Sequence, residues 1–220
     1  MIPIRDTIRT RHFPLVNILL ILLNVFFYGL QVSQGEAAGS FIARYALIPA
    51  RYTDPEWVSL FSSGQPITAL FTSMFLHGSF WHLLGNMWFL YIFGDNVEDR
   101  LGSRRYFFFY ILCGLASGVT HILLNPHSPV PTIGASGAVA GVMGAYFLLY
   151  PMARILTLIP LLFIPWLVEI PALLFLGLWF LMQFLSASLT SGQTVGIAWW
   201  AHVGGFLFGA FFLKIFHRKK

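Results

Sequence analysis

Six long apolar segments constrain the fold of this 220-residue chain more than any other feature. An apolar helix of about 20 residues is long enough to cross a hydrocarbon core of about 30 Å. The segments are residues 13–31, 79–94, 104–124, 135–150, 169–188 and 197–216. Only 10% of the residues are charged, whereas soluble domains carry about a quarter. We therefore predict an all-α, multi-pass membrane protein, a bundle of six transmembrane helices that forms one domain over residues 1–220.

Two of the predicted spans are short. Residues 79–94 and 135–150 would extend only about 24 Å as helices. A short span must either tilt or begin below the membrane surface beside a water-filled recess. The first span, 13–31, follows three arginines and so resembles a signal peptide. Its length and the further spans favour a helix that is retained.

The basic residues are distributed unevenly over the predicted loops. If the N-terminus is cytoplasmic, six spans return the C-terminus to the same side. Eleven basic residues then lie in the cytoplasm, namely Arg5, Arg9, Arg11, Arg100, Arg104, Arg105, Arg154, Lys214, Arg218, Lys219 and Lys220. Only Arg44 and Arg51 lie outside. Because cytoplasmic loops are enriched in Lys and Arg, we predict that both termini are cytoplasmic. The net charge of +5 is then a topology signal and not a patch that binds nucleic acid.

The connecting segments predict different structures. Residues 32–78 place Trp57 among aliphatic residues and prolines, which favours short helices lying in the outer interface. Residues 125–134 contain three prolines and are expected to form an extended loop. Residues 151–168 are apolar but also carry three prolines, so we expect an interfacial hairpin or a broken helix on the inner side. Residues 189–196 are uncharged and suit a flexible loop.

Polar side chains recur at one depth in three of the spans. His82 and Asn86 are four residues apart and share one helix face. Ser136 starts the fourth span, and His202 lies early in the sixth. With the predicted topology, all four side chains lie roughly 2–10 Å below the outer ends of their helices. Polar groups in hydrocarbon are costly, so this grouping predicts a functional site.

Two glycine pairs predict which helices are adjacent. Gly137 and Gly141 lie beside Ser136, and Gly205 and Gly209 lie beside His202. Small residues four apart allow helix backbones to approach closely in a membrane. We therefore expect the fourth and sixth spans to pack together and to bring Ser136 near His202.

A serine beside a histidine suits acyl transfer. Serine is a poor nucleophile until a base within hydrogen-bond reach removes its proton, and neutral histidine suits that task. Candidate donors for the oxyanion are the Ser136 backbone N–H, the Asn86 amide and the His82 ring. The carboxylates fall in the first outer loop or toward the inner side, so we predict a dyad rather than a triad.

These residue types also suit two other roles. A serine in a transmembrane helix commonly serves packing or bonds back to its own helix. His77, His82 and His202 could instead bind a metal ion. The five-residue spacing of His77 and His82 is poor for one helix face, and no cysteine or carboxylate joins them. The prediction is therefore that the chain uses no metal.

The motifs around these residues resemble those of a known family. They are His77-Gly-Ser-Phe-Trp-His82-Leu-Leu-Gly-Asn86, Val97-Glu-Asp-Arg-Leu-Gly102, Gly134-Ala-Ser136-Gly137 and Ala201-His202-x-x-Gly205-x-x-x-Gly209. Their order and separation are similar to those of the rhomboids, which are intramembrane serine proteases. From about residue 66 onward the chain looks like the minimal bacterial form with six helices.

The resemblance implies roles for individual residues. Ser136 would be the nucleophile, His202 the general base, and His82 and Asn86 part of the oxyanion hole. His77 would support the site. Glu98 and Arg100 match a structural pair on the cytoplasmic side. Many members have an aromatic residue four positions after the serine, where this chain has Ala140. The orientation of His202 would then depend on other residues, for which Trp199, Trp200 and Tyr146 are candidates.

The resemblance also implies substrates and a location. The substrates would be single-pass transmembrane proteins that approach through the lipid bilayer past the fifth span. They would be cut near the outer face of a bacterial-like plasma (inner) membrane, where the active site opens to the extracytoplasmic side. Residues 189–196 would cap the site, and no metal or cofactor would be needed.

Two other classes of function remain as alternatives. A rhomboid-like protein could bind membrane clients without cutting them, although such proteins typically lack the serine or the histidine. A small transporter would require further charges along a route through the bilayer. Only Glu169, expected at the inner end of the fifth span, comes close to such a position.

Overall fold

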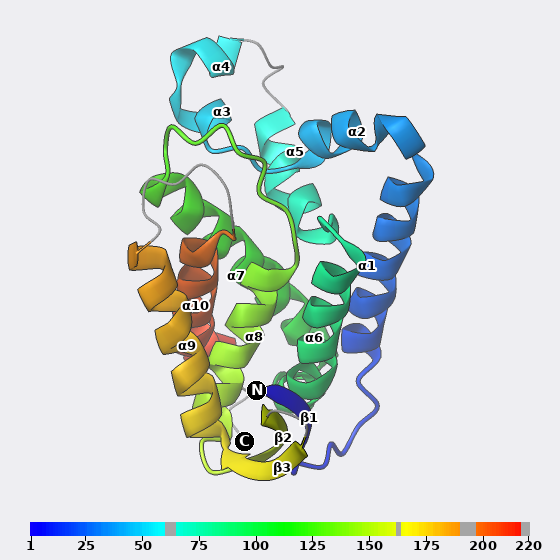
Figure 1. Cartoon of the computed structure of the whole chain (residues 1–220), viewed down its shortest axis with the longest axis vertical. Helices are drawn as coiled ribbons and strands as arrows, with labels where there is room; N and C mark the ends of the chain where they lie inside the picture. The colour runs from blue at the N-terminus through cyan, green and yellow to red at the C-terminus, as the bar shows by residue number, and fades with distance from the viewer. Residues whose placement is uncertain (60–64, 162–163, 190–196, 217–220) are drawn as a thin grey trace.

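The long helices lie side by side in a bundle. A computed structural model of the chain describes residues 1–59, 65–161, 164–189 and 197–216. The bundle helices are α1 (Leu15–Ser33), α6 (Phe80–Leu101), α7 (Ser103–Leu124), α8 (Ser136–Leu149), α9 (Ala172–Leu189) and α10 (Trp199–Phe216). Helix α8 is central and contacts α6, α7, α9 and α10. The N-terminus lies at the lower end in Figure 1.

Among the described residues, four helices are long and apolar enough to cross a membrane, namely α1, α7, α9 and α10. Helix α8 is also apolar but has only 14 residues. In Figure 1 the preceding loop descends from the upper end into the bundle before α8 begins. Helix α6 continues about two turns beyond the predicted span of 79–94. These added turns are charged, which is why the hydropathy pattern ended the span too early.

Short helices cover the upper end, as predicted for residues 32–78. They are η1 (Gly35–Ala37), α2 (Ala38–Tyr45), α3 (Ala50–Thr53), α4 (Pro55–Ser59), α5 (Gln65–Thr72) and η2 (Ser73–Phe75). The loop over residues 125–134 is extended, also as predicted, and forms one antiparallel bridge between Thr132 and Leu47. This bridge ties the loop that leads to Ser136 to the short helices.

The prediction of an all-α fold was wrong at the lower end, where three strands form an antiparallel sheet. The strands are β1 (Ile2–Asp6), β2 (Arg154–Leu161) and β3 (Ile164–Pro171), in the order β1-β2-β3. Residues 154–171 contain four isoleucines, one valine, one threonine and two aromatic residues, all of which favour strands, and their prolines oppose a helix. The hairpin was therefore the correct alternative for this segment. Glu169 lies in β3, and the fifth bundle helix begins at Ala172 rather than at 169.

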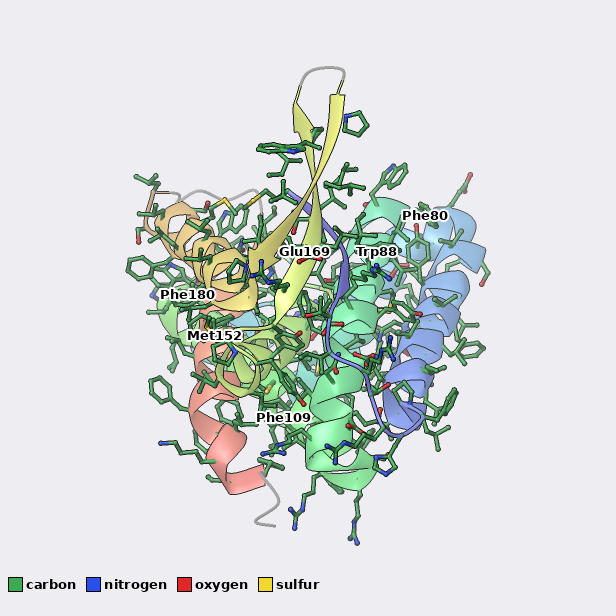
Figure 2. The ribbon with its side chains drawn as sticks, turned by 90° about the horizontal axis from the view of Figure 1, so that it is seen from below. Phe80, Trp88, Phe109, Met152, Glu169 and Phe180 are labelled. Atoms are coloured by element: carbon green, nitrogen blue, oxygen red, sulfur yellow. The ribbon has the colours of Figure 1, made fainter. Side chains whose placement is uncertain are left out.

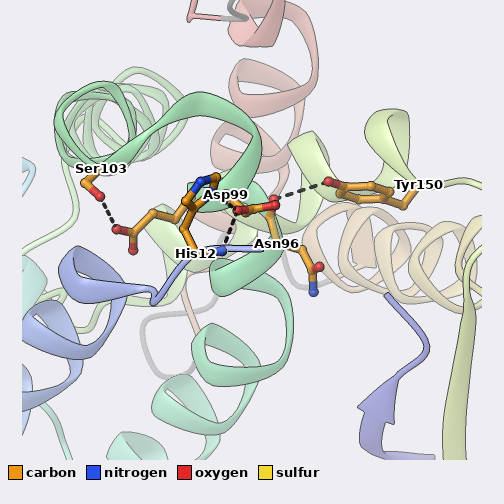
Figure 3. A network of polar contacts seen from close by, with 6 residues as sticks. His12, Asn96, Asp99, Ser103 and Tyr150 are labelled. Carbon is orange, nitrogen blue, oxygen red and sulfur yellow. Dashed lines mark hydrogen bonds and ion pairs between the residues drawn. The ribbon is translucent and has the colours of Figure 1, made fainter. Parts of the chain in front are cut away.

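Polar contacts fix the lower ends of the helices (Figure 3). The Glu98 carboxylate accepts hydrogen bonds from the backbone N–H groups of Val16 and Asn17 and from the Ser103 hydroxyl. The first N–H groups of a helix lack partners within it, so Glu98 satisfies two of those of α1. His12 Nδ1 lies 2.7 Å from the Asp99 carboxylate. The Tyr150 hydroxyl donates to the Asn96 carbonyl at 3.4 Å.

The first strand is tied to the bundle by Asp6. Its carboxylate accepts a hydrogen bond from the Tyr146 hydroxyl of α8 and another from Asn96 Nδ2 of α6 at 2.9 Å. Burial raises the pKa of the Asp6 carboxyl above its ordinary 3.8. A half-buried carboxyl therefore joins β1 to both helices.

Candidate active site

Ser136 is the first residue of α8, and a glycine turn sets its position. Gly134 has a φ of +126°, which residues other than glycine rarely adopt. A Cβ on Gly134 would lie 2.8 Å from Cε1 of His82, so this turn packs directly against the His82 ring. Ala135 provides no side-chain cap, and the N–H groups of the first turn have no partner within the helix. The start of α8 thus presents free backbone donors beside Ser136.

Glycines allow α8 and α10 to approach until their backbones touch. A Cβ on Gly205 would overlap the carbonyl oxygen of Gly137, and one on Gly209 would overlap that of Gly141. The packing predicted from the two glycine pairs is therefore confirmed. It places the first turns of the two helices side by side, and these turns carry Ser136 and His202.

Ser136 and His202 are within hydrogen-bond distance. Ser136 Oγ lies 2.8 Å from His202 Nε2, and the other ring nitrogen, Nδ1, lies 2.7 Å from Oε1 of Gln183. Trp179 stacks near the imidazole, with ring centroids 6.2 Å apart and planes 30° apart. Trp199 meets the ring edge-on at 6.0 Å. His202 therefore has neighbours on its faces and on both nitrogens.

The sequence predicted only some of these neighbours. Of its three candidates for orienting His202, Trp199 contacts the ring. Trp200 packs against Phe184, and Tyr146 bonds Asp6 well below the site. Gln183 and Trp179 were missed. An amide in the otherwise apolar α9 was the available signal, since buried polar groups in such helices require a partner.

His82 and Asn86 line the same cavity as the Ser–His pair. Ser79 caps α6 by accepting the His82 backbone N–H, and the Gly78 N–H points to His82 Nδ1 at 3.4 Å. Asn86 is buried, and its Nδ2 has no hydrogen-bond partner among the described residues. The cavity holds about 280 Å³ and is bordered by α6, α8, α9 and the start of α10. A second cavity of about 630 Å³ reaches Ser136 from the side of the descending loop.

His77 lies just behind this site. Its ring is fully buried, with its centroid 5.2 Å from that of His82. Gln31 of α1 holds the His77 backbone by bonding both its carbonyl and its N–H. Within the described ranges, no group of three or more His, Cys, Asp or Glu side chains is arranged to hold a metal ion. Residues 190–196, most of the predicted cap, lie outside the described residues.

The chain is similar to proteins of a known family. The profile of the Rhomboid domain matches residues 64–219. The chain belongs to the rhomboid family. That stretch contains all four candidate site residues and every helix from α6 to α10. The apolar helices and the family together identify a membrane protein of a protease family.

Several rhomboids of other organisms are similar to the chain. Rhomboid protein 1, mitochondrial, of Saccharomyces cerevisiae is 27% identical over 199 residues, which cover 86% of this chain and 50% of that protein. The putative rhomboid protease YdcA of Bacillus subtilis is 34% identical over 77 residues, or 35% of this chain and 38% of YdcA. Rhomboid protease GluP of the same species is 34% identical over 76 residues, or 34% of this chain and 14% of GluP. The chain spans half or less of the length of these relatives.

Proposed function

We propose that this rhomboid is an intramembrane serine endopeptidase that cuts transmembrane segments of other membrane proteins. The observation that carries the proposal is the 2.8 Å approach of Ser136 Oγ to His202 Nε2 within an apolar bundle. A nucleophile and a base at this distance suit acyl transfer. The family and the relatives named as proteases support the same reaction class.

The proposed reaction has two steps. Ser136 Oγ attacks the carbonyl carbon of the scissile peptide bond while its proton passes to His202 Nε2. The C–N bond then breaks, the leaving amine takes the proton from His202, and an ester on Ser136 remains. In the second step water attacks this ester and gives a proton to His202. That proton returns to Ser136 as the acid product leaves, so the dyad is regenerated.

The negative oxygen formed in each step requires hydrogen-bond donors. The free N–H groups at the start of α8, the Asn86 Nδ2 group and the His82 ring are candidates. Because the Gly78 N–H points to His82 Nδ1, a neutral His82 ring carries its proton on Nε2. His82 Nε2 is also the atom that lies near Gly134 and the start of α8. Asn86 Nδ2 is a buried donor without a partner in the described part of the chain, and such a donor is suited to a ligand that arrives only during the reaction.

We also propose a membrane topology for the six bundle helices. Helices α1, α6, α7, α8, α9 and α10 would be the six spans, with both termini in the cytoplasm and the dyad nearer the outer face. This follows from the excess of basic residues at the lower end. Substrates would be single-pass membrane proteins that approach between α6 and α9, where the 280 Å³ cavity lies. The plasma membrane is the proposed location.

The test is cleavage of a model single-pass substrate by purified protein in liposomes. Wild type is compared with Ser136→Ala and His202→Ala, with and without a metal chelator. We expect cleavage by the wild type alone, unchanged by the chelator. Cleavage by Ser136→Ala would refute the assignment of the nucleophile. If the wild type cuts none of several helix-destabilised substrates but still captures them, the client-binding alternative gains support.

A further inference from the structure

Gln183 links the histidine of the dyad to another helix. It lies on α9, its side chain is only 7% exposed, and its Oε1 atom is 2.7 Å from His202 Nδ1. His202 Nε2 in turn lies 2.8 Å from Ser136 Oγ. The three side chains therefore form a continuous line from α9 through α10 to α8.

The hydrogen-bonding groups of Gln183 and Ser136 determine the tautomer of the His202 imidazole. A carbonyl oxygen of an amide can only accept a hydrogen bond, so Nδ1 must carry the ring proton. In the neutral ring Nε2 is then unprotonated and can receive the proton of Ser136. Rotation of the ring by half a turn about the Cβ–Cγ bond would put Cδ2 and Cε1 in the places of Nδ1 and Nε2, so both contacts would be lost. An acceptor at Nδ1 therefore selects the one form of His202 that can act as a base toward Ser136.

Trp179 supports the same arrangement from the same helix. It lies one turn before Gln183 and stacks near the imidazole. Both side chains that come from α9 therefore restrict the His202 ring. The position of α9 sets the orientation of the ring.

We propose that Gln183 is a positioning residue, which holds His202 in the tautomer and orientation needed for proton transfer from Ser136. This inference rests on the proposed protease function. A neutral amide holds the ring without adding a charge. In this rhomboid, Gln183 would therefore occupy the orienting position that a carboxylate occupies in a Ser–His–Asp triad. Gln183 contacts neither the substrate carbonyl nor Ser136 in this role.

The test compares Gln183→Leu and Gln183→Glu with wild type and with Met182→Leu, a control on the exposed side of α9. Cleavage in liposomes gives kcat, KM and the pH–rate profile, and thermal unfolding monitors the fold. We expect Gln183→Leu to lower kcat about 10- to 100-fold with little change in KM. Gln183→Glu should retain activity, with the acidic limb of its profile moved to higher pH because a carboxylate stabilises the imidazolium.

Different results would overturn the two proposals. If the wild type does not cleave, the proposed function fails. If the wild type cleaves and both Gln183 variants keep its kcat and its pH profile, Gln183 serves packing only and the inference is wrong. If Gln183→Leu does not fold, the presence or absence of the shift in Gln183→Glu decides the question.

A separate observation concerns the hairpin of β2 and β3. Figure 2 shows it extending sideways past the outline of the helices, in the region between α6 and α9. At its root, Ile155 and Thr157 are fully buried. Farther out, the strands pair Leu158 with Leu167, Ile159 with Trp166 and Pro160 with Pro165. Trp166 and Leu167 are each 56% exposed. We call these six paired residues the apolar hairpin surface.

Exposure of the apolar hairpin surface to water is unfavourable. Strands in a sheet that faces water on one side alternate apolar and polar residues, but no charged residue occurs from Ile155 to Val168. The hairpin follows the end of α8 and precedes the start of α9, so it lies level with the ends of the bundle helices. β3 is an edge strand, and unpaired backbone groups exclude it from the hydrocarbon core. Tryptophan favours the boundary between water and the hydrocarbon core of the membrane.

The charged residues at the root of the hairpin also favour a position at the boundary between membrane and water. Arg5, Arg9 and Arg154 are exposed there, beside the half-buried Asp6 and the exposed Glu169. Arg154 lies 3.9 Å from Glu169. Basic side chains behind the apolar hairpin surface, which includes Trp166, match a segment bound to phospholipid headgroups. We infer that the apolar hairpin surface lies in the headgroup–acyl boundary of the leaflet at the lower end of the bundle.

Spin labels on single cysteines in liposomes test this inference, in a Cys113→Ala background. The label at Leu167→Cys is compared with Leu22→Cys on the exposed face of α1 and with Glu36→Cys in η1 at the upper end. We expect the Leu167 label to collide with oxygen more than with a water-soluble nickel complex, as at Leu22. Collision behaviour like that at Glu36 would overturn the inference. Dipolar broadening at Leu167 would also overturn it, since a second copy of the chain would then cover the surface.

Discussion

Gly205 of α10 packs on the backbone of Gly137, the residue directly after Ser136, with no room for a side chain between them. The neighbouring pair, Gly209 and Gly141, packs in the same way one turn below. Helix α8 is therefore held against α10 by backbone contact at the level of the candidate dyad. The short distance from Ser136 to His202 depends on this close approach.

Gly209→Ala should separate the two helices. The added Cβ would overlap the Gly141 carbonyl oxygen, which is backbone and cannot rotate away. We expect a loss of stability of about 1–3 kcal/mol, as for other overpacked sites, together with a large loss of cleavage. Thermal unfolding and liposome cleavage measure these effects. Gly29→Ala is the control, because nothing lies within 4 Å of its added Cβ. Equal behaviour of the two variants would contradict the backbone contact.

Asn86→Ala should impair the reaction without unfolding the protein. Loss of one oxyanion donor typically lowers kcat about 10²- to 10³-fold. Because Asn86 Nδ2 has no partner among the described residues, its removal should cost little stability. Asn86→Asp keeps the shape but removes the donor, so it should lose activity to a similar degree. Wild-type kcat in either variant would exclude Asn86 from the oxyanion hole.

Gly134→Ala should disturb the site by two effects. The positive φ strains any other residue by about 1–3 kcal/mol, and the added Cβ would press on the His82 ring. Gly35→Ala separates these effects, since Gly35 has a φ of +55° and nothing within 4 Å of its Cβ. We expect both variants to lose stability in thermal unfolding but only Gly134→Ala to lose most of its kcat. If the two lose activity equally, the contact with His82 is unimportant.

Asp6→Asn should change how stability depends on pH. Burial raises the pKa of the Asp6 carboxyl, so the folded state binds its proton more tightly than the unfolded state does. The resulting stabilisation is complete below the unfolded pKa and is lost as pH rises through the folded pKa. As the pH rises above about 4, the Tm of the wild type should therefore fall relative to that of Asp6→Asn. Unfolding in detergent across this range measures the difference, and a constant difference would show that the Asp6 pKa is not raised.

Local patterns were sufficient to predict much of the fold. The starts and ends of α1, α7, α8 and α10 lie within two residues of the apolar segments, because hydropathy and length directly determine which segments suit a membrane. The glycine pairs also predicted the contact of α8 with α10, since a missing side chain has the same effect in any close helix pair. The prediction failed where charges continue a helix, in α6, and where apolar residues form strands, in β2 and β3.

The sequence by itself determined that the chain forms apolar helices and that Ser136, His202, His82 and Asn86 are the unusual polar residues within them. Tertiary structure alone decided what surrounds His202. Gln183 and Trp179 precede it by about twenty residues and lie on another helix, and no local pattern gives the rotation of one helix relative to another. The pairing of β1 with β2 was likewise beyond local patterns, because it joins residues about 150 positions apart. Such contacts depend on how whole elements pack, since packing optimises the complete set of buried surfaces.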